Sequence, residues 1–326
     1  MTRSAFLIGG SGQIGLAVAE RLFADGWEVR IGSRHAPPAG PWRHAPLDRN
    51  APGALAGAVG EGTDLLLDCV AFDADHAGQL LDLQDVAGRI VAVSSASVYV
   101  DAHGRTLDEA REHGFPDLPV PVAESHPTVA PGNATYSTRK AAMEARLREA
   151  CGRATILRPC AIHGPHSKHA REWWFVKRLL DSRARIPLAY GGKSRFQTTS
   201  ARAIADAVVW ACSGDAPPVI NVCDADAPDV AQIGQTIMNL TGMRADLVPM
   251  PDEPFPPRVG MTPWSTARPF VCASSVPAAR RYAETVGPAL DWLIGLRDRD
   301  WRAALPQLAA YDRNHFDYAA EDTALP

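Results

Sequence analysis

The stretch Ile8-Gly9-Gly10-Ser11-Gly12-Gln13-Ile14-Gly15 constrains the fold of this chain more than any other part of the sequence. An apolar run, Ala5–Ile8, precedes it, and a helical pattern, Leu16–Phe23, follows it. Glycines allow the backbone to approach a pyrophosphate, and the amide groups and dipole at the start of the following helix favour an anion. The alternative is a tight turn that only connects a strand to a helix. The N-terminal position between these two elements favours a nucleotide cradle.

The residues after the second predicted strand, Trp27–Ile31, bear on the choice of nucleotide. In a dinucleotide fold this strand ends near the adenosine ribose, where an acidic residue selects NAD. Here Ser33 and Arg34 stand instead, and they suit a 2′-phosphate and adenine stacking. We therefore predict NADP, with NAD as the alternative. The alternative for Arg34 is a solvated surface arginine. Asp48 follows a weak third strand, Trp42–Leu47, and either accepts from the adenine amino group or caps a turn.

Strands and helices alternate through the first half of the chain, which is the pattern of a doubly wound parallel sheet in an α/β protein. Apolar runs such as Leu65–Leu67 fit a sheet that is covered on both faces. The remaining expected elements are helices over 13–25, 51–59, 75–83 and 136–150 and strands over 64–71, 89–95 and 154–159. After Gly164 the pattern changes, with helices expected over 171–180, 204–212, 230–241 and 288–297 and strands over 186–190 and 218–222.

Composition excludes several classes of protein. With 33 basic and 37 acidic residues among 326, the net charge of −4 argues against nucleic acid or an anionic membrane as partner. The six cysteines form no C-x-x-C pair, so we expect reduced thiols and predict no metal site. No apolar run approaches a membrane span, and the first strand begins by Ala5, so we expect no signal peptide and a cytoplasmic location.

Two stretches add catalytic chemistry to the predicted nucleotide fold. Ser94–Tyr99 follows a strand, at the sheet edge where ligands bind in open α/β folds. Tyr136 and Lys140 have the i, i+4 spacing that places them on one helix face. An ammonium beside the phenol is expected to lower its pKa from about 10, which suits a proton donor and acceptor. Ser95 is expected to hydrogen-bond a substrate oxygen. Each piece alone is also compatible with packing or capping, whereas their order and separation favour an enzyme.

With these motifs the chain resembles the extended short-chain dehydrogenase/reductase superfamily, the NAD(P)-dependent epimerases, dehydratases and reductases. The resemblance rests on the glycine loop, on Ser94–Tyr99, on Tyr136-x-x-x-Lys140 and on Leu157-Arg158-Pro159 followed by Ile162-His163-Gly164-Pro165. It is good from residue 1 to about 225 and weak beyond. It implies a Rossmann domain over 1–166 and 200–224, and a smaller C-terminal substrate-binding lobe with a tail over 167–199 and 225–326.

The resemblance also implies the site residues. The catalytic set is Ser95, Tyr136 and Lys140. The cofactor-binding set is Gly9, Gly12, Gln13, Ile14, Gly15, Ser33, Arg34, Asp48, Ala71, Lys140, Pro159 and Ile162, with the segment from Pro159 to Ile162 lining the nicotinamide. The candidate substrate contacts are Ser97, His163, His166, Trp173 and Arg195, where Trp173 alternatively fills a seam between lobes and Arg195 alternatively forms a structural ion pair.

Departures from the family pattern narrow the expected reaction. His163 stands where tyrosine is usual, and of the residues typical of sugar-nucleotide members only Arg195 fits. Ala96 and Ser97 replace the Asp-Glu pair of 4,6-dehydratases. We therefore predict an NADP(H)-dependent oxidoreductase acting on a small molecule with a carbonyl or secondary alcohol. The alternatives are a sugar or sugar-nucleotide epimerase with retained cofactor, and a non-catalytic NAD(P)-binding regulator. A homodimer is expected through the helices 75–83 and 136–150.

Overall fold

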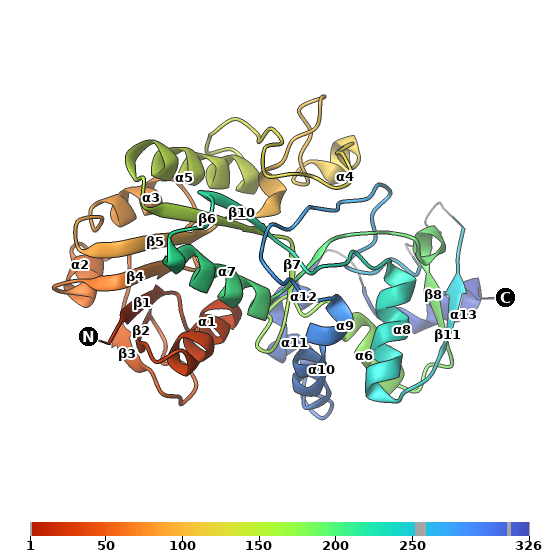
Figure 1. The fold of residues 1–326 in the computed structure, drawn as a ribbon. Helices are drawn as coiled ribbons and strands as arrows, with labels where there is room; N and C mark the ends of the chain where they lie inside the picture. The colour runs from red at the N-terminus through yellow and green to blue at the C-terminus, as the bar shows by residue number, and fades with distance from the viewer. Residues whose placement is uncertain (1, 252–258, 312–313, 326) are drawn as a thin grey trace.

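A computed structural model describes residues 2–251, 259–311 and 314–325 of the chain. Its centre is a seven-stranded sheet with the order β10-β6-β5-β4-β1-β2-β3, and all neighbouring strands are parallel (Figure 1). Helices cover both faces of the sheet. The predicted doubly wound α/β fold is therefore confirmed.

The sheet and its helices use most of the first 222 residues. The strands are β1 (Ser4–Ile8), β2 (Glu28–Ser33), β3 (Arg43–Pro46), β4 (Thr63–Asp68), β5 (Ala87–Val93), β6 (Ala154–Pro159) and β10 (Val219–Val222). One face carries α1 (Gln13–Ala24) and α7 (Ala201–Ser213). The other face carries α2 (Ala54–Val59), α3 (Ala74–Leu81) and α5 (Tyr136–Ala150). The connection between β5 and α5 contains η1 (Ala96–Val98) and α4 (Ala110–His113).

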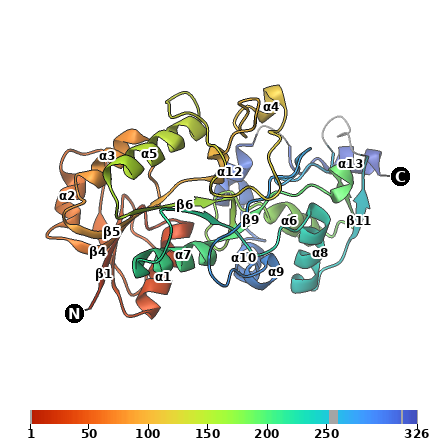
Figure 2. The same cartoon turned by 45° about the horizontal axis from the view of Figure 1, so that its top comes forward.

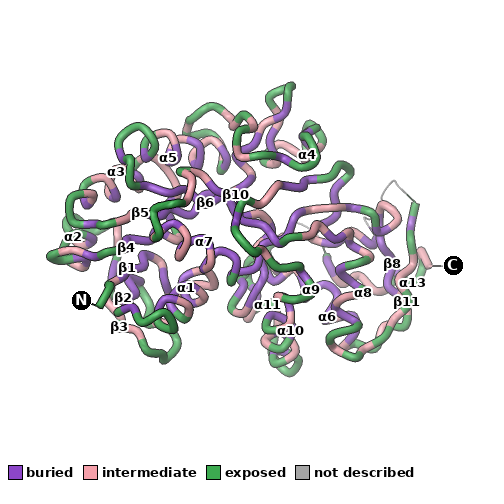
Figure 3. Tube along the Cα trace, viewed as in Figure 1, coloured by how far each residue is buried: buried purple, intermediate pink, exposed green. Residues whose placement is uncertain are grey.

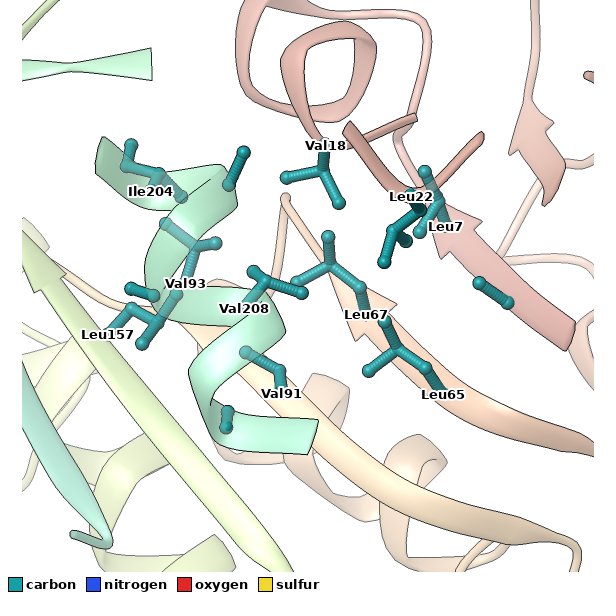
Figure 4. Close-up of a cluster of buried hydrophobic side chains, with 14 of the residues drawn as sticks. Leu7, Val18, Leu22, Leu65, Leu67, Val91, Val93, Leu157, Ile204 and Val208 are labelled. Carbon is teal, nitrogen blue, oxygen red and sulfur yellow. The ribbon is translucent and has the colours of Figure 1, made fainter. Parts of the chain in front are cut away.

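The apolar strands supply both cores of this sandwich because alternate side chains point to opposite faces. In β4, Leu65 and Leu67 join the core beneath α1 and α7, whereas Leu66 joins the core beneath α2, α3 and α5. Figure 4 shows Leu65 and Leu67 directed toward Val18 and Val208, which come from the two covering helices. Full burial of each such leucine contributes about 1.5–3 kcal/mol, so the strand sequence fixes the sheet at the centre.

The rest of the chain builds a second body beside the carboxyl ends of the sheet strands (Figures 1 and 2). Two short parallel pairs belong to it or lead into it: β8 (Arg185–Leu188) with β11 (Asp246–Pro249), and β7 (Ala161–His163) with β9 (Thr198–Ser200). Its helices are α6 (Trp173–Leu180), η2 (Ala189–Gly192), α8 (Val230–Thr241), α9 (Tyr282–Thr285), α10 (Gly287–Ile294), α11 (Trp301–Ala304), α12 (Pro306–Ala309) and α13 (Tyr318–Ala324). They enclose an apolar core of their own, which includes Trp174, Phe175, Ile237 and Leu290.

Element boundaries differ from the expectations where short-range hydrogen bonds decide them. The helix expected over 204–212 begins earlier, at Ala201, because the Ser200 hydroxyl accepts a hydrogen bond from the Ala203 amide at 3.1 Å. The strands β7, β9 and β11 were not predicted, since three or four residues are too few to show an alternating pattern. None of the helices in the described residues has the length and apolar character needed to cross a bilayer.

The end of the chain docks onto the second body. Arg178 of α6 is buried, donates to the carbonyl of His315 at 2.6 Å and pairs with Glu321 of α13. Figure 3 shows buried segments both in the sheet and in the second body. The tail therefore packs on its own chain over the described residues; Asp312 and Arg313 lie outside them.

A buried polar network joins α5 to the two strands beneath it. Glu144 of α5 accepts from the hydroxyl of Ser94 at 2.5 Å and from Nε of Arg158 at 3.0 Å. Arg158 of β6 also donates to the hydroxyl of Tyr99 at 3.1 Å, and Tyr99 donates to Asn221 of β10 at 2.7 Å. Because these side chains are almost inaccessible to water, the network orients α5 relative to the ends of β5, β6 and β10.

We expect Arg158→Met to lower the free energy of unfolding by about 3–5 kcal/mol, because it leaves the Glu144 carboxylate buried without its cation. The matched control is Arg202→Met, at an exposed position of α7, which should change stability by less than about 0.5 kcal/mol. Denaturant unfolding measures both. Equal losses in the two variants would contradict the importance of the buried pair.

Candidate functional site

The turn between β1 and α1 can be built only with glycine at two of its positions. Gly9 has a φ of +70°, and a Cβ there would lie 2.6 Å from Cγ1 of Val70. A Cβ at Gly15 would lie 2.2 Å from Cα of Gly10, so α1 packs directly against the turn. These contacts bring the start of the helix close to the sheet edge, as the sequence predicts for a phosphate cradle.

The first turn of α1 is open toward this edge. Gly12 is the N-cap residue, no side chain caps the helix, and its first turn carries no acidic residue. A Cβ on Gly12 would meet only the carbonyl oxygen of Gly9, at 3.7 Å, so the fold itself leaves room there. The amide groups at the start of α1 are thus available to an anion, which is the arrangement that binds a pyrophosphate.

A pocket of about 520 Å³ lies at the carboxyl ends of the strands and collects most of the predicted site. The glycine loop forms one wall, and Ser95, Ser97 and Tyr136 form another. Predicted cofactor residues that line it are Gly9, Gly12, Gln13, Ile14, Gly15, Pro159 and Ile162. Gln13 also donates to the carbonyl of Gly164 at 3.2 Å, which links the cradle to the end of β7.

Tyr136 is the first residue of α5, and 44% of it is exposed. Its phenol end nevertheless faces the pocket, where desolvation raises the pKa while a hydrogen bond with Ser95 lowers it, and the net direction is upward. The sequence predicts that the ammonium of Lys140 lowers this pKa. The net shift in the structure is upward instead, because burial of the phenol is the largest influence, although the Lys140 Nζ lies over the ring, 5.7 Å from its centroid.

Lys140 is buried one turn further along α5. Its Nζ donates to the carbonyl of Ala71 at 2.5 Å and to that of Val93 at 2.9 Å. Burial lowers its pKa to about 8, although the carboxylates of Asp68 and Glu144 oppose the shift. The ammonium thus sits between the ends of β4 and β5, behind the pocket wall that Tyr136 forms.

Ser95 and Ser97 occupy the turn after β5. The Ser95 hydroxyl accepts from the amide of Ser97 at 3.1 Å, which caps the short helix η1. Ser97 has a buried hydroxyl without a hydrogen-bond partner, and the residue lines the pocket. Both hydroxyls are therefore placed where a bound molecule can use them.

The predicted adenosine contacts lie outside this pocket. Ser33 is buried and donates to the carbonyl of His35 at 2.8 Å, while Arg34 is exposed and makes no hydrogen bond or ion pair with another described residue. Asp48 is exposed and accepts from the amide of Asn50 at 3.0 Å. Ala71 is buried, and its carbonyl is the acceptor for Lys140.

The predicted substrate contacts are not all brought together. His166 and Ser97 line the pocket. His163 is buried away from it, and its Nε2 lies 2.8 Å from Asp224, whose carboxylate outweighs the effect of burial and raises the pKa of the imidazole. Trp173 is 3% exposed and belongs to the core of the second body. Arg195 donates to the carbonyl of Ala227 at 3.1 Å and lines a different cavity. It forms no ion pair with another described residue, and its contact with a substrate stays a prediction.

Several lining residues were not singled out from the sequence. Lys168 and Arg171 follow His166 in the same loop, and their basic side chains were the one available signal. Phe196 and Phe270 stack with ring centroids 5.1 Å apart, although they are far apart in the chain. None of the described residues that line the pocket is acidic, so this wall presents positive charge.

Two glycine substitutions test separately how the turn contributes to folding and how it contributes to dinucleotide binding. Gly15→Ala should cost at least about 2 kcal/mol of stability because the new methyl group meets backbone. Gly12→Ala should change stability by less than about 1 kcal/mol but weaken nicotinamide-dinucleotide binding more than about tenfold, because the methyl group stands where the pyrophosphate approaches. Unfolding curves and cofactor fluorescence titration measure the two effects. Unchanged binding by Gly12→Ala would refute the cradle.

Comparisons with known proteins agree with this geometry. The sequence profile of the NAD dependent epimerase/dehydratase family matches residues 5–223. No curated protein sequence matches the chain significantly.

Solved structures with the same fold include enzymes of this kind. UDP-N-acetylglucosamine 4-epimerase from Methanobrevibacter ruminantium M1, in complex with UDP-N-acetylmuramic acid, is 15% identical with a TM-score of 0.67, over 90% of this chain and 99% of that chain. dTDP-glucose 4,6-dehydratase from Bacillus anthracis str. Ames, in complex with NAD, is 13% identical with a TM-score of 0.67, over 93% and 100%. A putative epimerase from Burkholderia cenocepacia J2315 is 21% identical with a TM-score of 0.66, over 90% and 98%. With its parallel sheet, its glycine cradle and the matching sequence profile, this chain belongs to the NAD dependent epimerase/dehydratase family.

Proposed function

We propose that this protein is an NADP(H)-dependent oxidoreductase that moves hydride between the nicotinamide and a carbonyl or secondary alcohol carbon. The observation that carries the proposal is the meeting of Ser95 and Tyr136 with the glycine cradle in one pocket. The bound dinucleotide supplies the hydride donor or acceptor. The absence of side chains at Gly9 and Gly15 and the uncapped start of α1 support its place in the cradle.

Each catalytic residue has a role that its surroundings support. Tyr136 has a raised pKa, so its phenol is protonated at neutral pH and can donate to a carbonyl oxygen as that oxygen gains charge. The hydroxyl of Ser95 holds the same oxygen and orients it toward the phenol. Lys140 is anchored behind them by two backbone carbonyls, where its ammonium stabilises a phenolate that forms during turnover and can reach a ribose hydroxyl.

Tyr136→Phe should lower turnover at least about 100-fold while leaving the dissociation constant for the cofactor within about threefold of the original, because it removes the proton donor and little else. The control is Tyr318→Phe, in α13, which should leave turnover unchanged. Stopped assays with NADPH and a panel of carbonyl compounds give the rate. Normal turnover by Tyr136→Phe would eliminate the proposed mechanism.

An epimerase is a second candidate, and the basic wall of the pocket favours it. Lys168 and Arg171 line the pocket, and no acidic described residue lines it, so an anionic substrate such as a sugar nucleotide is attracted. The same Tyr136 chemistry would then run in both directions, with hydride returned to the opposite face of the oxidised carbon. Net consumption of NADPH supports the reductase, whereas redox-neutral conversion of a sugar nucleotide without added cofactor supports the epimerase.

The preference for NADP rests on the end of β2. Arg34 is exposed and free of other described partners, and no acidic residue stands in Gly32–Arg34. A guanidinium there can form charge-assisted hydrogen bonds with a 2′-phosphate. The hydroxyl of Ser33 donates its proton to the carbonyl of His35. Its oxygen therefore remains as a hydrogen-bond acceptor or a weak contact for the nucleotide.

Arg34→Ala should weaken NADPH binding about tenfold or more and change NADH binding by less than about threefold, because only NADPH carries the 2′-phosphate. Arg148→Ala, at an exposed position of α5, is the control for loss of a surface charge. Fluorescence titration with each nucleotide provides the comparison. An equal loss for both nucleotides would contradict the 2′-phosphate contact.

We also propose the two domains that the sequence predicts, each with its own role. Residues 1–166 and 200–224 hold the dinucleotide, and residues 167–199 and 225–326 supply the substrate contacts and the tail. Pairing of two copies through α3 and α5 stays a prediction of the sequence. These two helices pack against each other on one face of the sheet.

A further inference from the structure

Three cysteines from distant parts of the chain converge beside the pocket. Cys160 follows β6, Cys223 follows β10, and Cys272 lies in the segment that bridges to Val122. Their three sulfur atoms all lie within 4.8 Å of one another, and Sγ of Cys160 is 3.6 Å from Sγ of Cys223. The other three cysteines take no part, so the convergence is specific to this place among the described residues. We call these three residues the thiol triad.

The spacing of the triad matches a shared metal ion. A zinc–thiolate bond is about 2.3 Å long, so two sulfur atoms on one tetrahedral zinc lie about 3.8 Å apart. The observed separations need only small side-chain movements to reach that value. Ligands that are all sulfur select soft or borderline cations such as Zn²⁺ or Cu⁺ over Mg²⁺ and Ca²⁺.

Backbone contacts hold the triad in place. The hydroxyl of Thr199 accepts from the amide of Cys160 at 2.9 Å and donates to the carbonyl of Val222 at 2.6 Å, next to Cys223. The segment of Cys272 is fixed on both sides, because Val122 donates to the carbonyl of Val271 at 2.7 Å and accepts from Ala273 at 2.9 Å. Ligands positioned in this way lose little freedom when a metal binds.

The triad is also accessible from one side. Cys223 and Cys272 are 0% and 4% exposed, whereas Cys160 is partly exposed and lines the pocket with Ser95 and Tyr136. Aromatic and aliphatic residues surround the buried side, including Tyr99, Leu118 and Phe270. A metal held by three protein ligands with one position open to a pocket has the coordination of catalytic rather than structural zinc sites.

We propose that Cys160, Cys223 and Cys272 form a three-thiolate site for Zn²⁺, with the fourth ligand supplied from the pocket. The site does not depend on the proposed hydride transfer. The three cysteines bind the metal as thiolates, and their protons are released to solvent when it binds. The sequence had instead predicted reduced thiols and no metal site. A ligand bound at the fourth position would lie beside Cys160 at the pocket wall.

The test uses the full-length chain, reduced and stripped of metal with a chelator, and Co²⁺ as a spectroscopic probe for Zn²⁺. We expect one equivalent of Co²⁺ to give the thiolate-to-cobalt charge-transfer absorption and the visible bands of tetrahedral cobalt, and Zn²⁺ to abolish both. Cys272→Ser and Cys160→Ala should each weaken Co²⁺ binding more than about tenfold. Because Cys160 is partly exposed, Cys160→Ala should leave the fold intact, so that weaker Co²⁺ binding by this variant reports the loss of a ligand.

Cys151→Ser is the matched control, since Cys151 is also buried but lies in the core beneath α3 and α5. It should bind Co²⁺ like the original chain. The proposal is overturned if stoichiometric Co²⁺ gives no thiolate absorption, or if the absorption survives replacement of all three cysteines. Peptide mapping that finds a Cys160–Cys223 disulfide in metal-free protein exposed to air, with no Co²⁺ binding by the reduced chain, would likewise overturn it in favour of a redox pair.

Discussion

The ion pair between Glu144 and Arg158 is the interaction on which the site depends. It is buried, it includes the hydroxyl of Ser94, and it extends through Tyr99 to Asn221. Tyr136 and Lys140 precede Glu144 on the same helix, and Ser95 follows Ser94. The pair therefore sets the register between the helix that carries the phenol and the strand end that carries the hydroxyl. Burying two charges costs free energy, and the contribution of this pair is to position α5, because in this arrangement each charge finds its partner.

The pocket combines a rigid floor with a wall of different origin. Glycine contacts that admit no side chain define the floor, whereas Lys140, held by two carbonyls, lies behind the lining. The opposite wall comes from the loop after Gly164, from the stacked pair Phe196 and Phe270, and from Gln307 near the end of the chain. The floor is where we propose the dinucleotide, and the wall is where we propose the substrate contacts. This separation explains why a fold shared by epimerases and dehydratases leaves the substrate open.

Much of the fold could be predicted because its elements carry local signals. The helices α5 and α8 and the strand β6 begin and end at the predicted residues, since side-chain caps at Thr135 and Asp229 and a continuous apolar strand mark them. The strands β7, β9 and β11 carry no such signal, because three or four residues pair only after the flanking segments have met. The direction of the Tyr136 pKa shift was wrong for a related reason: spacing on a helix places Lys140 beside the ring, but it does not reveal how far the surrounding segments bury the phenol, and burial raises its pKa.

The sequence by itself determined the α/β class and the glycine turn before α1, because both depend on contacts between residues close in the chain or on the order of strands and helices. The catalytic set of Ser95, Tyr136 and Lys140 stays a prediction of the sequence. Only the tertiary structure decided which side chains meet across long separations. It directed His163 to Asp224 and Arg195 to the carbonyl of Ala227, away from the pocket. It also gathered Cys160, Cys223 and Cys272, which no sequence spacing connects. Their meeting follows from the packing of β6 and β10 against the C-terminal segment, and such packing is decided by the whole core at once.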